Sequence, residues 1–209
     1  GVTLDQDLSG STQAKSVVQK VNQTLKFFYR KNSYFNFKEK KMLCTALIQP
    51  RFDYGCNSWF RNLHTGLKHK LQTAQNKVMR LILGVHPRFH IGYNSFKKLG
   101  WLDTQKRVDY LTVSLVYKIY NGQAPSYMSN MIRVSDRHSY QTRDSEMNFV
   151  VPHVKQQEHR GFMYNGIKLW NKLPTDVKSS PSLSIFKRKT KQVYMEEMGA
   201  LESGIFTQA

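Results

Sequence analysis

The sequence predicts a mainly α-helical protein, with a helical bundle followed by a smaller, mostly helical C-terminal domain that includes a basic loop and one or two short strands. Three observations support this fold class. Apolar residues recur every three to four positions in several long stretches, as on the buried side of an amphipathic helix. Residues that begin or end helices stand at the limits of these stretches. Hydrophobic residues make up 40% of the 209 residues, enough for a folded core.

The N-terminal region is expected to begin with a short strand over residues 1–10, which ends in a turn at Ser9-Gly10. An amphipathic helix should then span residues 12–31, because its apolar residues follow the spacing of a core-facing stripe. These residues are Ala14, Val17, Val18, Val21, Leu25 and Phe28.

Two further helices follow in this region. Asn36 and Glu39 have the spacing of a capping box, so a helix should begin at Asn36, continue to about Gln49 and stop before Pro50. Residues 51–60 are rich in aromatic side chains and are expected to form a short buried helix. A third long helix is predicted over residues 65–83, with Gly84 as its C-terminal cap.

The second half of the chain is organised differently. A short helix is expected near residues 93–99, and a longer one from Thr104 to Tyr120. Residues 133–157 are polar and basic and indicate a loop, in which residues 148–152 could form a strand. The predicted domains are therefore residues 1–10, 11–84 and 85–209. The last of these also includes a helix within 158–172, a helix that begins near Ser182 and a frayed end over residues 199–209.

Charge is the most unusual property of the composition. The chain has 32 Lys and Arg residues against 14 Asp and Glu residues, a formal net charge of +18. A charge of this size opposes compaction and favours a polyanionic partner, of which nucleic acid is the most common. The alternative is a basic surface with no binding role.

Two predicted helices present polar faces without acidic residues. On the first helix the face recurs at spacings of three and four residues, as one side of a helix requires. It contains Lys15, Gln19, Asn22, Lys26 and Arg30. On the helix over 65–83, the corresponding face contains His69, Thr73, Asn76 and Arg80. Lys and Arg can contact phosphates and amides can reach sugars or groove edges, so these faces are candidate nucleic-acid contacts.

Other candidate contacts are less specific. Lys187, Arg188 and Lys191 could form a cationic patch on the last helix, or a solvated helix face. Phe27 lies off the apolar face of the first helix, where it could stack on a base or pack against a neighbouring domain. Trp170 is expected to be a core residue, with a stacking platform as the alternative.

Sequence motifs for catalysis are missing. Two-metal phosphoryl transfer needs carboxylates held together on a metal ion, and the eight aspartates are scattered with no Asp-Asp pair. Asp5 and Asp7 could share a strand face, although a solvated hairpin fits them better. His86 and His90 have a zinc-like spacing but no Cys-x-x-Cys motif accompanies them. No catalytic residue, metal site or cofactor is therefore expected in this chain.

The cysteines and the hydropathy suggest an intracellular protein, in the nucleus or the cytoplasm. Cys44 and Cys56 are the only cysteines, which is too few for a disulfide scaffold and indicates a reducing compartment. No apolar run approaches the length of a membrane span, so no membrane partner is expected. Residues 1–5 show no signal peptide and no starting Met. We therefore expect the chain to be a fragment of a longer protein.

Several motifs follow one another in a distinctive order. One stretch has Gln49-Pro50, Tyr54-Gly55 and Trp59, and continues into a helix rich in Gln, Lys and Arg over 71–82. A second stretch has Tyr140-Gln-Thr-Arg143, then Trp170-Asn-Lys-Leu-Pro174, then Phe186-Lys187. With residues 1–5, these motifs resemble the end of the palm, the thumb and the tail of jockey-like, LINE-type non-LTR retrotransposon reverse transcriptases.

The resemblance implies part of an RNA-directed DNA polymerase, in which residues 1–10 end the palm, residues 11–84 form a thumb that clamps the template–primer duplex, and residues 85–209 form a tail domain. The fingers, the catalytic aspartates of the palm and their Mg²⁺ would lie in the rest of the parent polymerase. The implied partners are RNA, DNA or an RNA–DNA hybrid, together with the missing fingers and palm. The alternatives are a stand-alone basic nucleic-acid-binding module and a non-functional remnant of an element.

Overall fold

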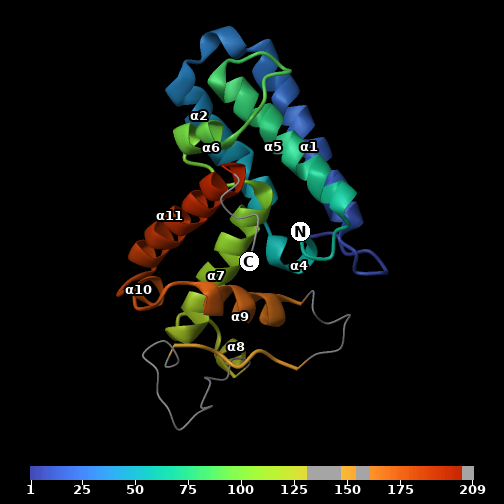
Figure 1. Ribbon diagram of the computed structural model, residues 1–209. Helices are drawn as coiled ribbons and strands as arrows, with labels where there is room; N and C mark the ends of the chain where they lie inside the picture. The colour runs from blue at the N-terminus through green and yellow to red at the C-terminus, as the bar shows by residue number, and fades with distance from the viewer. Residues whose placement is uncertain (131–146, 154–160, 204–209) are drawn as a thin grey trace. The chain divides into compact units, whose positions relative to one another are not determined.

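The predicted mainly α fold is confirmed by the computed structural model (Figure 1). The structure describes residues 1–130, 147–153 and 161–203. These residues belong to two compact units. The first unit combines residues 1–108 with 195–209, and the second comprises residues 109–194. Helices α7 (Thr104–Tyr120) and α11 (Leu183–Glu202) each contribute residues to both units.

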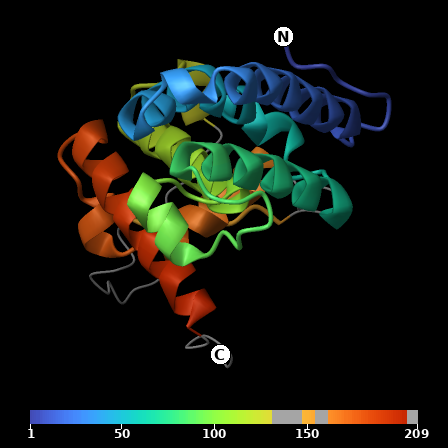
Figure 2. The same ribbon diagram turned by 90° about the horizontal axis from the view of Figure 1, so that it is seen from above.

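The first unit is built around two long helices, α1 (Ser11–Arg30) and α5 (Thr65–Leu83). These helices lie side by side and run in the same direction (Figures 1 and 2). Shorter helices of this unit are α2 (Phe37–Leu47), α3 (Gln49–Asp53), α4 (Cys56–Trp59) and α6 (Tyr93–Leu99), and a 3₁₀ turn spans Asn32–Tyr34. The predicted helices over 12–31, 65–83, 93–99 and 104–120 are therefore confirmed, and Gly84 caps α5 in the left-handed conformation.

The core of the first unit forms where the apolar stripes of α1 and α5 meet the short helices. The α1 residues Ala14, Val17, Val21, Leu25 and Phe28 are all buried, as are the α5 residues Leu67, Leu71, Ala74, Val78, Leu81 and Ile82. Val18 was expected on the same stripe but is only partly buried. Its position, 100° round the helix from Val17, takes it to the edge of the stripe.

The start of α2 matches its predicted signal, whereas its end differs. Asn36 and Glu39 form the capping box: Glu39 N–H donates to Asn36 Oδ1 at 3.1 Å, and Asn36 N–H donates to Glu39 Oε2 at 2.8 Å. The helix ends at Leu47, and Pro50 lies in the first turn of α3 instead of after a helix. A proline is tolerated there because the first-turn N–H groups have no partner within the helix.

Residues 1–10 do not form the predicted strand. They adopt an irregular conformation in which the carboxylate of Asp5 caps the start of α1. It accepts hydrogen bonds from Ser9 Oγ at 2.8 Å, Gly10 N–H at 3.2 Å and Ser11 N–H at 3.0 Å. Gly10 has φ of 72°, and a Cβ there would lie 2.5 Å from the carbonyl oxygen of Trp59, so only glycine fits. Asp5 is therefore neither a strand residue nor a hairpin residue but a helix cap.

The Asp5 cap makes a pH-dependent contribution to stability. The hydrogen bond from the Ser9 hydroxyl, together with the N–H groups of Gly10 and Thr12, lowers the pKa of Asp5 from 3.8. A lowered pKa means that the stabilisation is present above pH 3.8 and is lost as the pH falls through the folded-state pKa. In thermal denaturation, Asp5→Ala should lower Tm at neutral pH, and the difference from wild type should shrink in acid. Asp7→Ala, at an exposed position, is the control; an equal loss there would contradict the cap.

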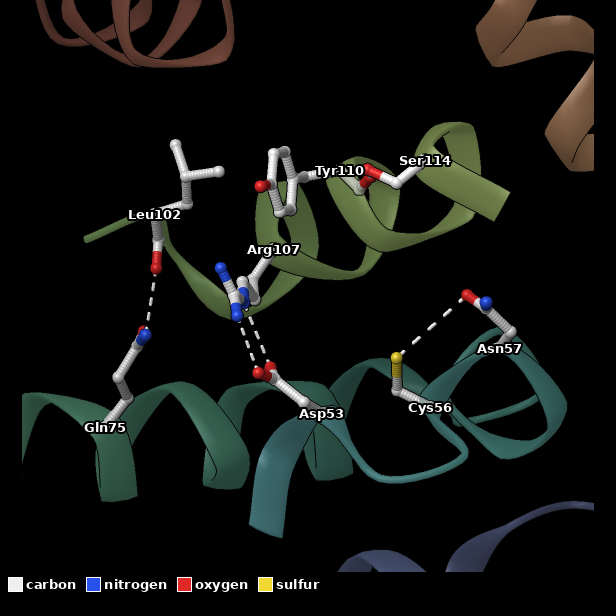
Figure 3. A network of polar contacts seen from close by, with 8 residues as sticks. All are labelled: Asp53, Cys56, Asn57, Gln75, Leu102, Arg107, Tyr110 and Ser114. Atoms are coloured by element: carbon white, nitrogen blue, oxygen red, sulfur yellow. Dashed lines mark hydrogen bonds and ion pairs between the residues drawn. The ribbon is translucent and has the colours of Figure 1, made fainter. Parts of the chain in front are cut away.

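The unit boundary differs from the predicted domain boundary after residue 84. Residues 85–108 belong to the first unit. Polar side chains of α5 bind residues 102 and 104 of this segment. Gln75 Nε2 donates to the carbonyl of Leu102 at 2.9 Å (Figure 3), and Gln72 Oε1 accepts from Thr104 N–H at 2.9 Å. Gln75 is buried, so these bonds replace water that the amide has lost. The spacing of apolar residues predicts no partner for Gln72 or Gln75. The sequence analysis therefore did not connect α5 with residues 102–104.

An ion pair also joins α3 to the first turn of α7. Arg107 donates to both carboxylate oxygens of Asp53, at 3.0 and 2.6 Å (Figure 3). Cys56 lies beside this pair at the start of α4, with its Sγ directed toward Asn57. The bidentate geometry fixes the orientation of both side chains.

The two cysteines are buried free thiols. Burial raises the pKa of Cys44 to about 12, and burial together with the charge of Asp53 raises the pKa of Cys56 to about 12. Since only the thiolate is nucleophilic, both should resist an alkylating reagent at pH near 8 until denaturant is added. Thiol titration against time would measure this, and rapid modification of the native chain would contradict it.

The second unit contains the rest of α7, α8 (Ser126–Ser129), α9 (Phe162–Lys172), α10 (Thr175–Lys178) and the first part of α11. Its core is aromatic. Trp170 is 0% exposed and lies 5.5 Å from Phe149, 5.8 Å from Phe186 and 6.5 Å from Tyr117 between ring centroids. Its Nε1–H donates to the carbonyl of Met147 at 2.7 Å. The expectation that Trp170 is a core residue is confirmed.

Two expectations for the C-terminal half need correction. Within residues 147–153 only Phe149 has a bridge-type pairing, so the predicted strand over 148–152 does not form. The frayed end was predicted from residue 199, but α11 continues to Glu202. Glu202 Oε2 accepts from Tyr93 N–H at 2.5 Å, which holds the last turn against α6. The basic loop at 133–146 and 154–157, residues 158–160 and residues 204–209 lie outside the described residues.

Candidate nucleic-acid interface

A groove of about 450 Å³ runs along α1 and the start of α5 in the first unit. Most of its lining side chains are lysines or amides, and Val18 and Leu67 contribute apolar side chains. The complete lining consists of Lys15, Val18, Gln19, Asn22, Gln23, Lys26, Leu67 and Lys70. Four of the five residues predicted on the polar face of α1 are therefore brought together in one hollow.

Helix geometry explains why these side chains share the groove. Lys15, Gln19, Asn22 and Lys26 are separated by four, three and four residues, so they project from one side of α1. With a rise of about 1.5 Å per residue, Lys15 and Lys26 stand about 17 Å apart along the axis. The spacing of base pairs along a duplex is about 3.4 Å, so the two ammonium groups span about five of them.

Lys70 was not predicted to be a contact, although it faces α1 from the other side of the groove. It lies three residues after buried Leu67, so it borders the part of the apolar stripe that packs beside α1. Gln23 also lines the groove but was not predicted. It lies one residue after Asn22, so it does not fit the spacing of three and four residues that defined the predicted face. The sequence shows that Lys70 lies beside the apolar stripe of α5. It does not show which side of that stripe faces α1, because this depends on how the two helices pack.

The groove has few carboxylates in its surroundings. Residues 11–102 contain 17 Lys and Arg residues and two acidic residues, Glu39 and Asp53. Glu39 is engaged in the capping box of α2, and Asp53 is paired with Arg107. No acidic residue lines the groove. Its positive charge is therefore balanced by no lining carboxylate, and it favours a ligand that carries a regular series of negative charges.

The other predicted contacts on α1 and α5 do not line the groove: Arg30, and the α5 face of His69, Thr73, Asn76 and Arg80. Arg30 is exposed one turn beyond Lys26. Asn76 accepts a hydrogen bond from Gln72 Nε2 at 2.8 Å, and Arg80 Nε donates to the carbonyl of Phe89 at 2.8 Å. Asn76 and Arg80, on the polar face of α5, therefore make internal contacts, and this face is centred about 90° away from the flank that bears Lys70.

The predicted contacts on α11 belong to the second unit. Arg188 is exposed, and Lys187 and Lys191 are partly exposed. Their neighbour Lys189 forms an ion pair with Asp176 at 3.3 Å, so the charge of this segment is partly offset. Lys187, Arg188 and Lys191 are not among the residues that line the α1–α5 groove.

Phe27 is 57% exposed, with its ring edge-on to that of Phe28 at 5.7 Å between centroids. It lies about 100° from the centre of the groove residues, so it is accessible but does not line the groove. Among residues 1–130, 147–153 and 161–203, the structure contains no group of three His, Cys, Asp or Glu side chains that could hold a metal ion. In the same ranges no helix is both long and apolar enough to span a bilayer.

Comparisons with family models, curated proteins and solved structures give no match to this chain.

Proposed function

We propose that the chain is a nucleic-acid-binding part of the RNA-directed DNA polymerase of a non-LTR retrotransposon, and that it clamps the template–primer duplex in the α1–α5 groove. The observation that carries the proposal is the gathering of Lys15, Lys26 and Lys70 around one hollow with no carboxylate among its lining residues. The order of motifs along the chain supports the retrotransposon parentage. The partner would be an RNA–DNA hybrid, RNA or DNA, inside the cell, with the fingers and palm supplied by the parent polymerase.

In this proposal the groove recognises shape and charge. The three ammonium groups contact backbone phosphates, while Gln19, Asn22 and Gln23 offer amides to sugar hydroxyls or groove edges. Such contacts position a duplex but carry little sequence information. The chain contributes neither catalytic aspartates nor a cofactor; Mg²⁺ would be required only by the parent polymerase.

The salt dependence of binding tests the proposal. Each neutralised phosphate on a duplex contributes about −0.9 to the slope of log K against log salt, so three lysines give a slope of about −3. Fluorescence anisotropy with a labelled RNA–DNA hybrid at several salt concentrations would measure it, and duplexes of unrelated base sequence should bind equally. A slope near zero, or binding that follows base sequence, would overturn the clamp.

A further inference from the structure

A tightly held turn follows α5 at residues 86–89. Phe89 N–H donates to the carbonyl of His86 at 2.9 Å, which closes the turn, and Pro87 occupies its second position. Arg88 N–H donates to Nδ1 of the His86 ring at 3.2 Å. Proline restricts the backbone at the position where turns favour it. The side chains of Arg88 and Phe89 are therefore presented from a fixed backbone.

Arg80 fastens this turn to α5 and places it near the end of α1. Its Nε donates to the carbonyl of Phe89 at 2.8 Å. Arg80 lies in the last turn of α5, and Tyr29 lies in the last turn of α1. Because the two helices lie side by side and run in the same direction (Figures 1 and 2), both residues are at the same end of the helix pair. Tyr29 stands one turn beyond Lys26 on α1. The turn thus lies at the end of the helix pair toward which the groove runs.

The exposed surface of the turn suits a nucleotide. The ring of Phe89 is 48% exposed, and Arg88, His86 and His90 beside it are exposed as well. The sequence from Tyr54 to Leu102 contains no acidic residue. An exposed aromatic ring among basic side chains matches a planar base attached to a phosphate. Single-stranded nucleic acid is held without sequence preference by this combination of stacking and charge.

We infer that Phe89 is a stacking platform for an unpaired base on a strand that leaves the duplex bound in the groove. Arg88 would contact the phosphate of that nucleotide. The inference rests on the proposed function, and it specifies the substrate as a duplex with a single-stranded extension instead of a blunt duplex.

The test compares a blunt hybrid with one that carries an unpaired tail of roughly four nucleotides, a length that one binding site can cover. The wild-type chain should bind the tailed hybrid about tenfold more tightly, the scale of one base–aromatic stack. Phe89→Ala should remove this preference without weakening binding to the blunt hybrid, and Phe89→Trp should retain it. Tyr54→Ala, at an exposed aromatic residue between α3 and α4, is the matched control and should leave the preference intact.

Two results would contradict the inference, and they distinguish failure of the Phe89 platform from failure of the proposed function. If wild type and Phe89→Ala bind both hybrids equally well, the platform is refuted while the groove stands. If neither hybrid binds to the wild-type chain, the proposed function fails, and the platform fails with it. Loss of the preference in Tyr54→Ala as well as in Phe89→Ala would also overturn the assignment to the turn.

Discussion

Replacing Lys15, Lys26 and Lys70 together by Glu is expected to abolish binding of the chain to a nucleic-acid duplex. All three residues line the groove, and all three are exposed. A charge pair at 4 Å is worth about 1 kcal/mol in water, and reversal replaces an attraction with a repulsion. Three reversals therefore weaken the binding free energy by about 6 kcal/mol at low salt. Salt screening reduces this loss, and we expect Kd to rise by at least about a hundredfold.

A matched triple variant separates position from net charge. Lys20, Lys31 and Lys38 are exposed and lie outside the groove, and Lys20 is on the far side of α1. Each Lys→Glu change removes two positive charges, so both triple variants lower the formal charge from +18 to +12. Anisotropy should show near wild-type binding for the control. Equal losses in both variants would mean that a diffuse charge binds the duplex, and the groove would have no special role.

The polar face of α1 was predictable because it depends on one helix only. The spacing of Lys15, Gln19, Asn22 and Lys26 fixes their common side, and burial of Ala14, Val21 and their neighbours fixes the opposite side. Neither inference requires knowledge of a second element. For the same reason the limits of α5, the cap at Gly84 and the capping box of α2 agree with the sequence prediction.

What the sequence could not supply were the contacts between elements. Lys70 faces the groove because of the way α5 pairs with α1, and Arg80 is withdrawn from the predicted face by the carbonyl of Phe89. Gln72 and Gln75 bind Thr104 and Leu102, about thirty residues away along the chain. Polar side chains on a helix carry no local signal of such partners, since solvent and a distant backbone satisfy them equally well.

Trp170→Ala is expected to destabilise the second unit severely. The side chain is 0% exposed and packs among the rings of Phe149, Tyr117 and Phe186, and its indole N–H is satisfied by Met147. Truncation leaves a large cavity and an unpaired carbonyl, with a loss of about 3–5 kcal/mol in the free energy of unfolding. Small domains are stable by only about 5–15 kcal/mol, so most of this margin would disappear.

Denaturant unfolding followed by circular dichroism measures the loss, and two variants isolate its cause. Trp170→Phe keeps an aromatic ring but removes the donor to Met147. It should lower the free energy of unfolding by less than the alanine variant does, because a lost hydrogen bond and a small void cost less than a large cavity. Tyr127→Ala changes an exposed aromatic residue in the same unit and should stay within about 0.5 kcal/mol of wild type. A comparably small effect for Trp170→Ala would show that the aromatic cluster does not hold this unit together, because a residue with no solvent exposure can be dispensable only where the packing around it is loose.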